Sequence, residues 1–123
     1  MTKRKKVRSW GEHNITQYLK DNKINYVREH KFEDCLSEKN HPLRFDFFLP
    51  DYNLLIEFQG KHHYEPVNKG WRAKKVTAAT KKRDIIKSDY AKDNKIALLA
   101  IPYWEKENIN KILIQVFEYA HSL

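Results

Sequence analysis

The stretch LRFDFFLPDYNLLIEFQ, residues 43–59, decides the fold of this chain. Two dense apolar runs, at 43–49 and 54–59, predict β-strands. The four residues between them, Pro50–Asp51–Tyr52–Asn53, are typical of a tight turn, because proline, aspartate and asparagine favour turn conformations. The stretch therefore predicts a β-hairpin. The continuous apolar start of its second run predicts a central strand of a larger sheet.

The residues before the hairpin predict a helix and a further strand. Ser9 and Glu12 have the spacing of a capping box, which marks the start of a helix, and polar residues end this helix at 20–23. Residues 26–32 predict a strand, and the polar segment 34–42 predicts a loop. The apolar side chains expected on the helix are Trp10, Ile15, Tyr18 and Leu19.

The residues after the hairpin predict a helix, a strand and a last helix. The segment 61–80 is basic and irregular, a helix is expected at 81–93, and an apolar strand at 96–101 stops before Pro102. The apolar side of the helix at 81–93 is expected at Ile85, Ile86 and Tyr90. The apolar face of the last helix is expected at Ile109, Ile112, Leu113, Val116 and Phe117.

The expected order of elements is α-β-β-β-α-β-α. The third strand, the following helix and the fourth strand can form a crossover unit, which would place these two strands parallel with a right-handed connection. The sequence therefore predicts an α/β (α+β) fold, in which helices flank a mixed central β-sheet. We expect a basic N-terminal arm at 1–8 and a single domain at 9–123.

The charge of the chain points to a polyanionic partner. Its 123 residues carry a formal net charge of +8 at pH 7, and small basic domains are candidates for binding nucleic acid. No apolar run is long enough for a membrane span. One cysteine, Cys35, excludes an internal disulfide and a cysteine-rich zinc site. A cytoplasmic protein without membrane contact is expected.

The hairpin brings two carboxylates together. If its turn is centred on 51–52, the numbers of paired residues add to 103, and Asp46 faces Glu57 with Cβ atoms roughly 5 Å apart. Two such charges among apolar neighbours repel each other, and a divalent cation removes the conflict. Mg²⁺ prefers oxygen ligands of this kind. The same sum places Arg44 opposite Gln59 on this polar face. The other face is expected to hold Phe45, Phe47, Leu49, Leu54, Ile56 and Phe58.

A plainer interpretation of the two carboxylates stays open. Asp46 and Glu57 can lie on a solvated face of the hairpin and pair with Arg44 or with a nearby lysine. A different loop length or a β-bulge would also break the pairing sum.

Five pieces of the chain, in order, resemble one nuclease superfamily. They are GE (11–12), RFDFFLP (44–50), IEFQGKHHY (56–64), RDIIK (83–87) and AIPY (100–103). The chain resembles the PD-(D/E)XK superfamily, and within it the small phage and mobile-element endonucleases related to very-short-patch-repair and homing endonucleases. The resemblance implies a restriction-endonuclease-like fold and a Mg²⁺-dependent endodeoxyribonuclease, in which Mn²⁺ substitutes for Mg²⁺.

The resemblance also implies a set of metal ligands. They are the carboxylates of Asp46 and Glu57, the backbone carbonyl of Phe58, and Glu12 of the first helix. For Glu12 a second interpretation is the capping box with Ser9, and the two roles compete for the same carboxylate.

Gln59 departs from the family pattern, which has lysine at this position. Lysine there orients the attacking water and stabilises the charged transition state, whereas glutamine can only orient water. Lys61 and Lys87 are candidates to substitute for it. Asp84, on the same helical stripe as Lys87, pairs with that lysine or supports the site.

His63 and a basic segment complete the expected site. The resemblance aligns His63 with a family histidine that acts as a general acid or base, and the alternative is a buried structural histidine. The basic residues cluster around Trp71, in a loop that either contacts DNA phosphates or is simply solvated. The expected DNA-binding residues are Arg44, Lys61, Lys69, Trp71, Arg72, Lys74, Lys75, Lys81, Lys82 and Arg83.

Three alternative functions remain. The chain can be a catalytically inactive DNA-binding module with the same fold. It can be a structure-selective junction resolvase, which would act as a homodimer. It can also cleave RNA, because nothing in the sequence reads a 2′-hydroxyl.

Overall fold

The computed structural model describes residues 10–61 and 71–123. Its elements follow the predicted order, with one added 3-10 helix, η2. They are α1 (Trp10–Asp21), β1 (Val27–Leu36), β2 (Pro42–Leu49), β3 (Leu54–Gln59), α2 (Trp71–Asp93), β4 (Ala97–Pro102), η2 (Tyr103–Asn108) and α3 (Ile109–Ser122). The fold is α+β.

In the described part of the chain, four strands form one mixed sheet in the order β1-β2-β3-β4. β1 and β3 both pair antiparallel with β2, and β4 pairs parallel with β3 over the whole of both strands. The predicted hairpin register is confirmed at Phe47↔Ile56, Phe48↔Leu55 and Leu49↔Leu54, whose numbers all add to 103. The parallel crossover from β3 to β4 is confirmed as well.

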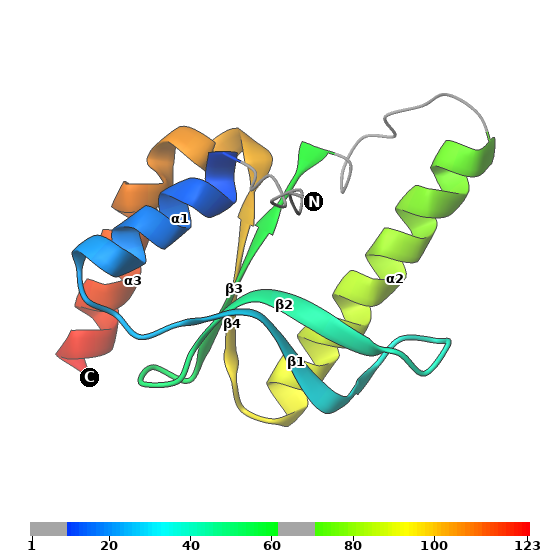
Figure 1. Cartoon of the computed structure of the whole chain (residues 1–123), viewed down its shortest axis with the longest axis horizontal. Coiled ribbons are helices and arrows are strands. Elements are labelled where there is room, and N and C mark those ends of the chain that lie inside the picture. The colour runs from blue at the N-terminus through cyan, green and yellow to red at the C-terminus, as the bar shows by residue number, and fades with distance from the viewer. Residues whose placement is uncertain (1–9, 62–70) are drawn as a thin grey trace, which may run out of the picture.

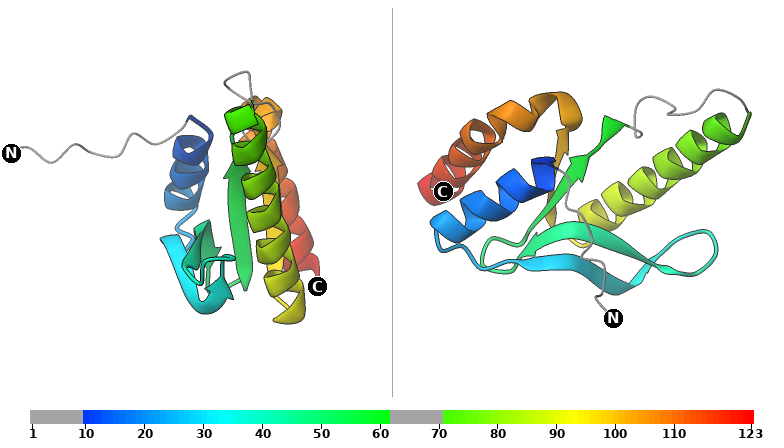
Figure 2. Two further views of the ribbon diagram at one scale, coloured as in Figure 1. Left: turned by 90° about the vertical axis from the view of Figure 1, so that its right-hand side faces the viewer. Right: turned by 45° about the horizontal axis from the view of Figure 1, so that its top comes forward.

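The helices cover both faces of the sheet. α1 and α3 lie on one face and α2 on the other (Figure 1; Figure 2 shows α2 in front of the sheet and α3 behind it). Alternation along β3 serves both layers, because Leu54 and Ile56 pack with α1 and α3 whereas Leu55 packs with α2. By the same alternation Glu57 points toward α2 and Phe58 toward α1.

β2 changes its face at Asp46. Phe45 packs in the cluster beneath α2, whereas Phe47 packs with α1 and α3, so the prediction that both share one face is wrong. The ladder with β1 pairs Arg28 with Phe47 and His30 with Phe45. Between these pairs Glu29 adopts a left-handed φ of 51°, a conformation that is uncommon for residues other than glycine. This kink lies beside Asp46.

Three element boundaries or faces differ from prediction. β1 continues past Phe32 to Leu36, because Cys35 is buried beneath α2. α2 begins at Trp71 instead of Lys81; its first turns are rich in alanine and lysine, which favour helix without producing an apolar stripe. Trp10 and Ile85, expected on apolar faces, are 65% and 60% exposed. No helix in the described ranges has the length and apolar character that crossing a membrane requires.

Gly11 sets the distance between α1 and β3. A Cβ atom at this position would lie 2.2 Å from two atoms of the Phe58 ring. We expect Gly11→Ala to destabilise the fold by about 1–3 kcal/mol through overpacking, despite the better helix propensity of alanine. The measurement is urea unfolding of both proteins.

A smaller ring partner provides the control. In a Phe58→Leu background the same Gly11→Ala change should cost less, because the clash is with the ring. An equal cost in both backgrounds would contradict this account of the contact.

Candidate functional site

The site forms where β2 and β3 separate. Their ladder ends at Phe47↔Ile56, and the next residue on each strand is an acid. The Phe58 N–H donates to Asp46 Oδ2 at 2.7 Å, and the Asp46 N–H donates to Glu57 Oε2 at 3.3 Å. The structure brings Asp46 and Glu57 together as predicted. Each carboxylate bonds to a backbone N–H of the other strand, and the two residues are not a pair in the β-ladder.

Asp46 carries an electrostatic conflict. Burial raises its pKa most, and the charge of Glu57, a hydrogen bond with the Glu57 side chain and the charge of Glu12 raise it further. The Phe58 N–H lowers it, but the balance raises the pKa of Asp46 to about 8. The carboxyl pair therefore holds a proton at neutral pH when no cation is bound.

Lys87 brings one cation to the pair from α2. Its Nζ donates to Glu57 Oε1 at 2.5 Å, and the two side chains are only 16% and 12% exposed. The ammonium group also lies 5.3 Å from the centroid of the Phe45 ring. A buried ion pair of this geometry fixes both side chains. The expected placement of Lys87 in the site is therefore supported by a direct contact, while the part of Asp84 stays a prediction.

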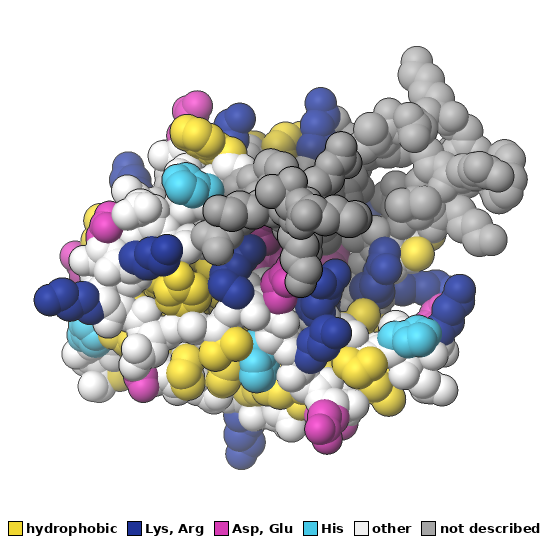
Figure 3. Space-filling view, in the orientation of Figure 1, with side chains coloured by type: hydrophobic (Ala, Val, Ile, Leu, Met, Phe, Trp, Pro, Cys, Tyr) yellow, Lys and Arg dark blue, Asp and Glu magenta, His cyan; other side chains and the backbone are white. Residues whose placement is uncertain are grey.

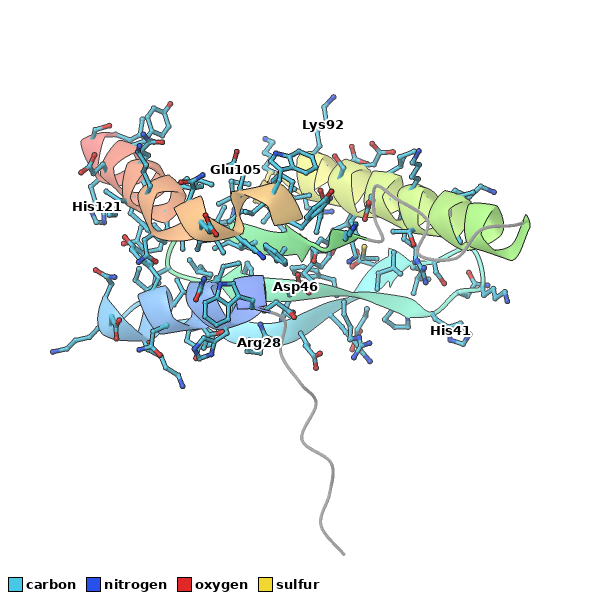
Figure 4. The ribbon with its side chains drawn as sticks, turned by 90° about the horizontal axis from the view of Figure 1, so that it is seen from above. Arg28, His41, Asp46, Lys92, Glu105 and His121 are labelled. Atoms are coloured by element: carbon cyan, nitrogen blue, oxygen red, sulfur yellow. The ribbon has the colours of Figure 1, made fainter. Side chains whose placement is uncertain are left out.

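Arg28 on β1 is a site residue that sequence reasoning missed. Its Nη2 lies 3.4 Å from Glu12 Oε1, and its guanidinium carbon lies 4.4 Å from the centroid of the Phe47 ring. Its Nη1 is buried and has no hydrogen-bond partner within the described ranges. Figure 4 shows Arg28 and Asp46 on neighbouring strands near the start of α1. The β1–β2 register would reveal Arg28, but the sequence predicts these two strands without predicting how their residues pair.

Glu12 lies close enough to act on Asp46. Its carboxylate contributes to the raised pKa of Asp46 and is held by Arg28. Both Glu12 and Arg28 side chains are about four-fifths buried. Ser9, the partner of Glu12 in the expected capping box, lies outside the described residues.

Arg44 does not face Gln59 as predicted. Because β2 leaves β3 beyond Phe47, Arg44 pairs in the ladder with Lys31 of β1, and its guanidinium lies 3.7 Å from Glu29. Gln59 ends β3 and pairs with Pro102 of β4.

The other predicted residues belong to α2 or to the segment of the sequence between β3 and α2. Lys61 is exposed just after β3, and Lys81 is exposed on α2. Lys82 pairs with Glu38 at 3.2 Å, and Arg83 donates to Thr80 at 3.5 Å. The prediction of a loop around Trp71 is wrong from that residue onward, because α2 begins at Trp71 and includes Arg72, Lys74 and Lys75. His63 and Lys69 lie outside the described residues.

The donor set fits a hard cation. Among the described residues, no group of three histidine, cysteine or acidic side chains is gathered closely enough to hold a metal. Two carboxylates remain, and Mg²⁺ is commonly bound by one or two carboxylates completed by waters and substrate phosphates. Such an ion would take the place of the proton on Asp46 and would share the charge of Glu57 with Lys87.

Comparisons with known proteins gave no match: no protein-family model, no curated protein and no solved structure resembles this chain closely enough to be matched.

The pKa of Asp46 predicts how stability depends on pH. A folded-state pKa raised above that of the unfolded chain stabilises the fold fully below about pH 4, and this contribution is lost as the pH rises through about 8. In EDTA, the free energy of unfolding of the natural protein should therefore fall, relative to Asp46→Asn, between about pH 4 and pH 8. A constant difference between the two proteins over that range would contradict the assignment.

The contact between Arg28 and Glu12 predicts a measurable coupling. A double-mutant cycle with Arg28→Ala and Glu12→Gln should give a coupling energy of about 1 kcal/mol by urea unfolding, because both side chains are mostly buried. The matched control is Arg44 with Glu29, which also joins two neighbouring elements but is 54% and 38% exposed. That exposed pair should couple by less than about 0.5 kcal/mol. Equal coupling energies in the two cycles would contradict the assignment of Arg28 to the site.

Proposed function

We propose that this chain is a Mg²⁺-dependent DNA endonuclease of the PD-(D/E)XK type, which hydrolyses phosphodiester bonds. The observation that carries the proposal is the close approach of Asp46 and Glu57. Their charges are offset by a proton and by the ammonium group of Lys87. Carboxyl groups whose pKa is strongly raised by burial and by a neighbouring charge, as that of Asp46 is, are concentrated at functional sites. The net charge of +8 supports a nucleic-acid substrate.

Asp46 and Glu57 would hold the ion, with the Phe58 carbonyl as a further ligand, and Glu12, whose charge reaches Asp46, would bind a water of the ion. When bound, Mg²⁺ supplies a water of lowered pKa and offsets charge on the scissile phosphate. The Phe58 N–H already fixes the Asp46 carboxylate. Arg28 holds Glu12 beside the pair and keeps its carboxylate from turning into solvent.

Lys87 is proposed to substitute for the lysine that the family has at position 59. One N–H of its ammonium group is used by Glu57, and two further donors remain for a phosphate oxygen or a water. Gln59 would orient the water, and Lys61, exposed beyond β3, is the weaker candidate for the cationic role. General acid or base action by His63 belongs to the same proposal.

Two related functions are separable from this one. An inactive DNA-binding module of the same fold would bind DNA and cut nothing. A junction resolvase would use the same chemistry, prefer branched DNA and act as a homodimer. The proposed setting in each case is the cytoplasm of a cell.

A plasmid-nicking assay tests the proposal. The natural protein should convert supercoiled plasmid to nicked or linear DNA with Mg²⁺ or Mn²⁺, and not with EDTA. Asp46→Asn and Glu57→Gln should each lower the rate by at least about 100-fold, and Lys87→Met by about 10- to 100-fold, because a transition-state donor is lost. DNA binding, measured separately, should persist in all three.

Asp93→Asn is the matched control, because Asp93 is exposed in the last turn of α2 and undergoes the same chemical change. It should cut at the natural rate. Normal cutting by Asp46→Asn in metal-replete buffer would overturn the assignment, and binding without cutting by the natural protein would favour the inactive module. Linear, nicked and branched substrates assayed side by side distinguish the resolvase.

A further inference from the structure

A groove lies between α2 and the end of the β1–β2 hairpin. Its volume is about 480 Å³, and it is lined on one side by the turn at 37–41 and the start of β2, and on the other by the middle of α2. Its basic lining residues are Lys39, His41, Arg44, Arg83 and Lys87, and its acidic lining residue among those described is Asp84. We call this region the hairpin groove.

Positive charge dominates the hairpin groove. Lysine and arginine side chains gather on this part of the surface, over the hairpin and α2, and adjoin the acidic side chains near the centre of the face (Figure 3). Arg44 is 54% exposed, and its contact with Glu29 at 3.7 Å is open to solvent. Exchanging such an exposed pair for a phosphate contact costs little. The groove is therefore suited to an anion with several charges.

The hairpin groove and the carboxylate pair share Lys87. This residue lines the groove and also contacts Glu57, so an anion bound in the groove beside Lys87 lies next to the residue that holds Glu57. Arg83 lies one helical turn before Lys87, about 6 Å along the helix axis. This separation is close to the step between neighbouring phosphates in an extended strand.

We propose that the hairpin groove binds the sugar-phosphate backbone of one unpaired DNA strand, one or two nucleotides from the bond that is cut. The position of that bond rests on the proposed function. A space of about 480 Å³ is the size of a small-ligand pocket and receives one or two nucleotides, whereas a duplex would stay outside it. The planar guanidinium groups of Arg44 and Arg83 on opposite walls would each form paired hydrogen bonds with a phosphate.

Binding of a fluorescent tetrathymidylate, measured by anisotropy in EDTA, tests the proposal without any cleavage. Arg44→Gln and Arg83→Gln should each weaken binding about 5- to 10-fold. Each should also lower the slope of log affinity against log salt by about 0.7, the value for one lost contact to a single strand. Lys39→Glu should weaken binding by a similar factor. Because Lys39 is exposed in the turn, this substitution disturbs no packing.

Lys92→Gln and Lys92→Glu are the matched controls. Lys92 lies in the last turn of α2, on the side of the molecule away from His41 in Figure 4, and the substitutions make the same changes of charge. They should leave affinity within about twofold. If the Lys92 variants weaken binding as much as the groove variants, overall charge is responsible and the proposal is overturned.

Two further probes decide between kinds of ligand. The groove variants should lose more affinity for tetrathymidylate than for a blunt duplex, and equal losses would overturn the claim of an unpaired strand. Inorganic phosphate should compete at least 10-fold more weakly than the tetranucleotide, and equal competition would reduce the groove to a site for one phosphate.

The outcome is separable from that of the proposed function. If no variant and no metal gives cleavage, but the groove variants lose tetrathymidylate binding as stated, the groove stands and the endonuclease proposal fails. If Asp46→Asn abolishes cleavage while groove variants bind tetrathymidylate normally, the endonuclease stands and the groove proposal fails.

Discussion

The separation of β2 from β3 beyond Phe47 and Ile56 is the constraint on which the other features depend. A hairpin that continued its ladder would pair backbone donors with backbone carbonyls at alternate residues. Because the strands part, the carboxylates of Asp46 and Glu57 instead accept the N–H groups of Phe58 and Asp46. Buried backbone donors must find partners, so the two acids are held by the fold itself. Their mutual repulsion follows from that placement.

The neighbouring elements are arranged around this gap. α1 approaches β3 closely enough that position 11 must be glycine, and this approach brings Glu12 beside Asp46. α2 crosses the opposite face and delivers Lys87 to Glu57. β1 contributes Arg28, whose guanidinium lies over the Phe47 ring and holds Glu12. Three separate elements thus add charge to a point that the hairpin alone defines.

The sequence predicts the parts of this arrangement that depend on local pattern. Turn chemistry at 50–53 and alternation in both strands are sufficient for the register that brings Asp46 near Glu57, and the apolar runs are sufficient for the mixed sheet. The sequence does not predict the features that depend on tertiary packing. Nothing local indicates that β2 turns its face between Phe45 and Phe47, and this turn separates Arg44 from Gln59. The partner of Lys87 and the placement of Arg28 depend on the packing of α2 and on the β1 register, which no short motif encodes.

The site joins contacts of very different range along the chain. The bond between Asp46 and Glu57 spans 11 residues, whereas the bond between Glu57 and Lys87 spans 30 and requires α2 to dock on the finished sheet. Closing a short loop costs less conformational entropy than closing a long one, so the acidic half can assemble while the basic half is still absent. Loosening of α2 would then remove the lysine first and leave the two acids in place, more strongly in need of a counter-ion than before.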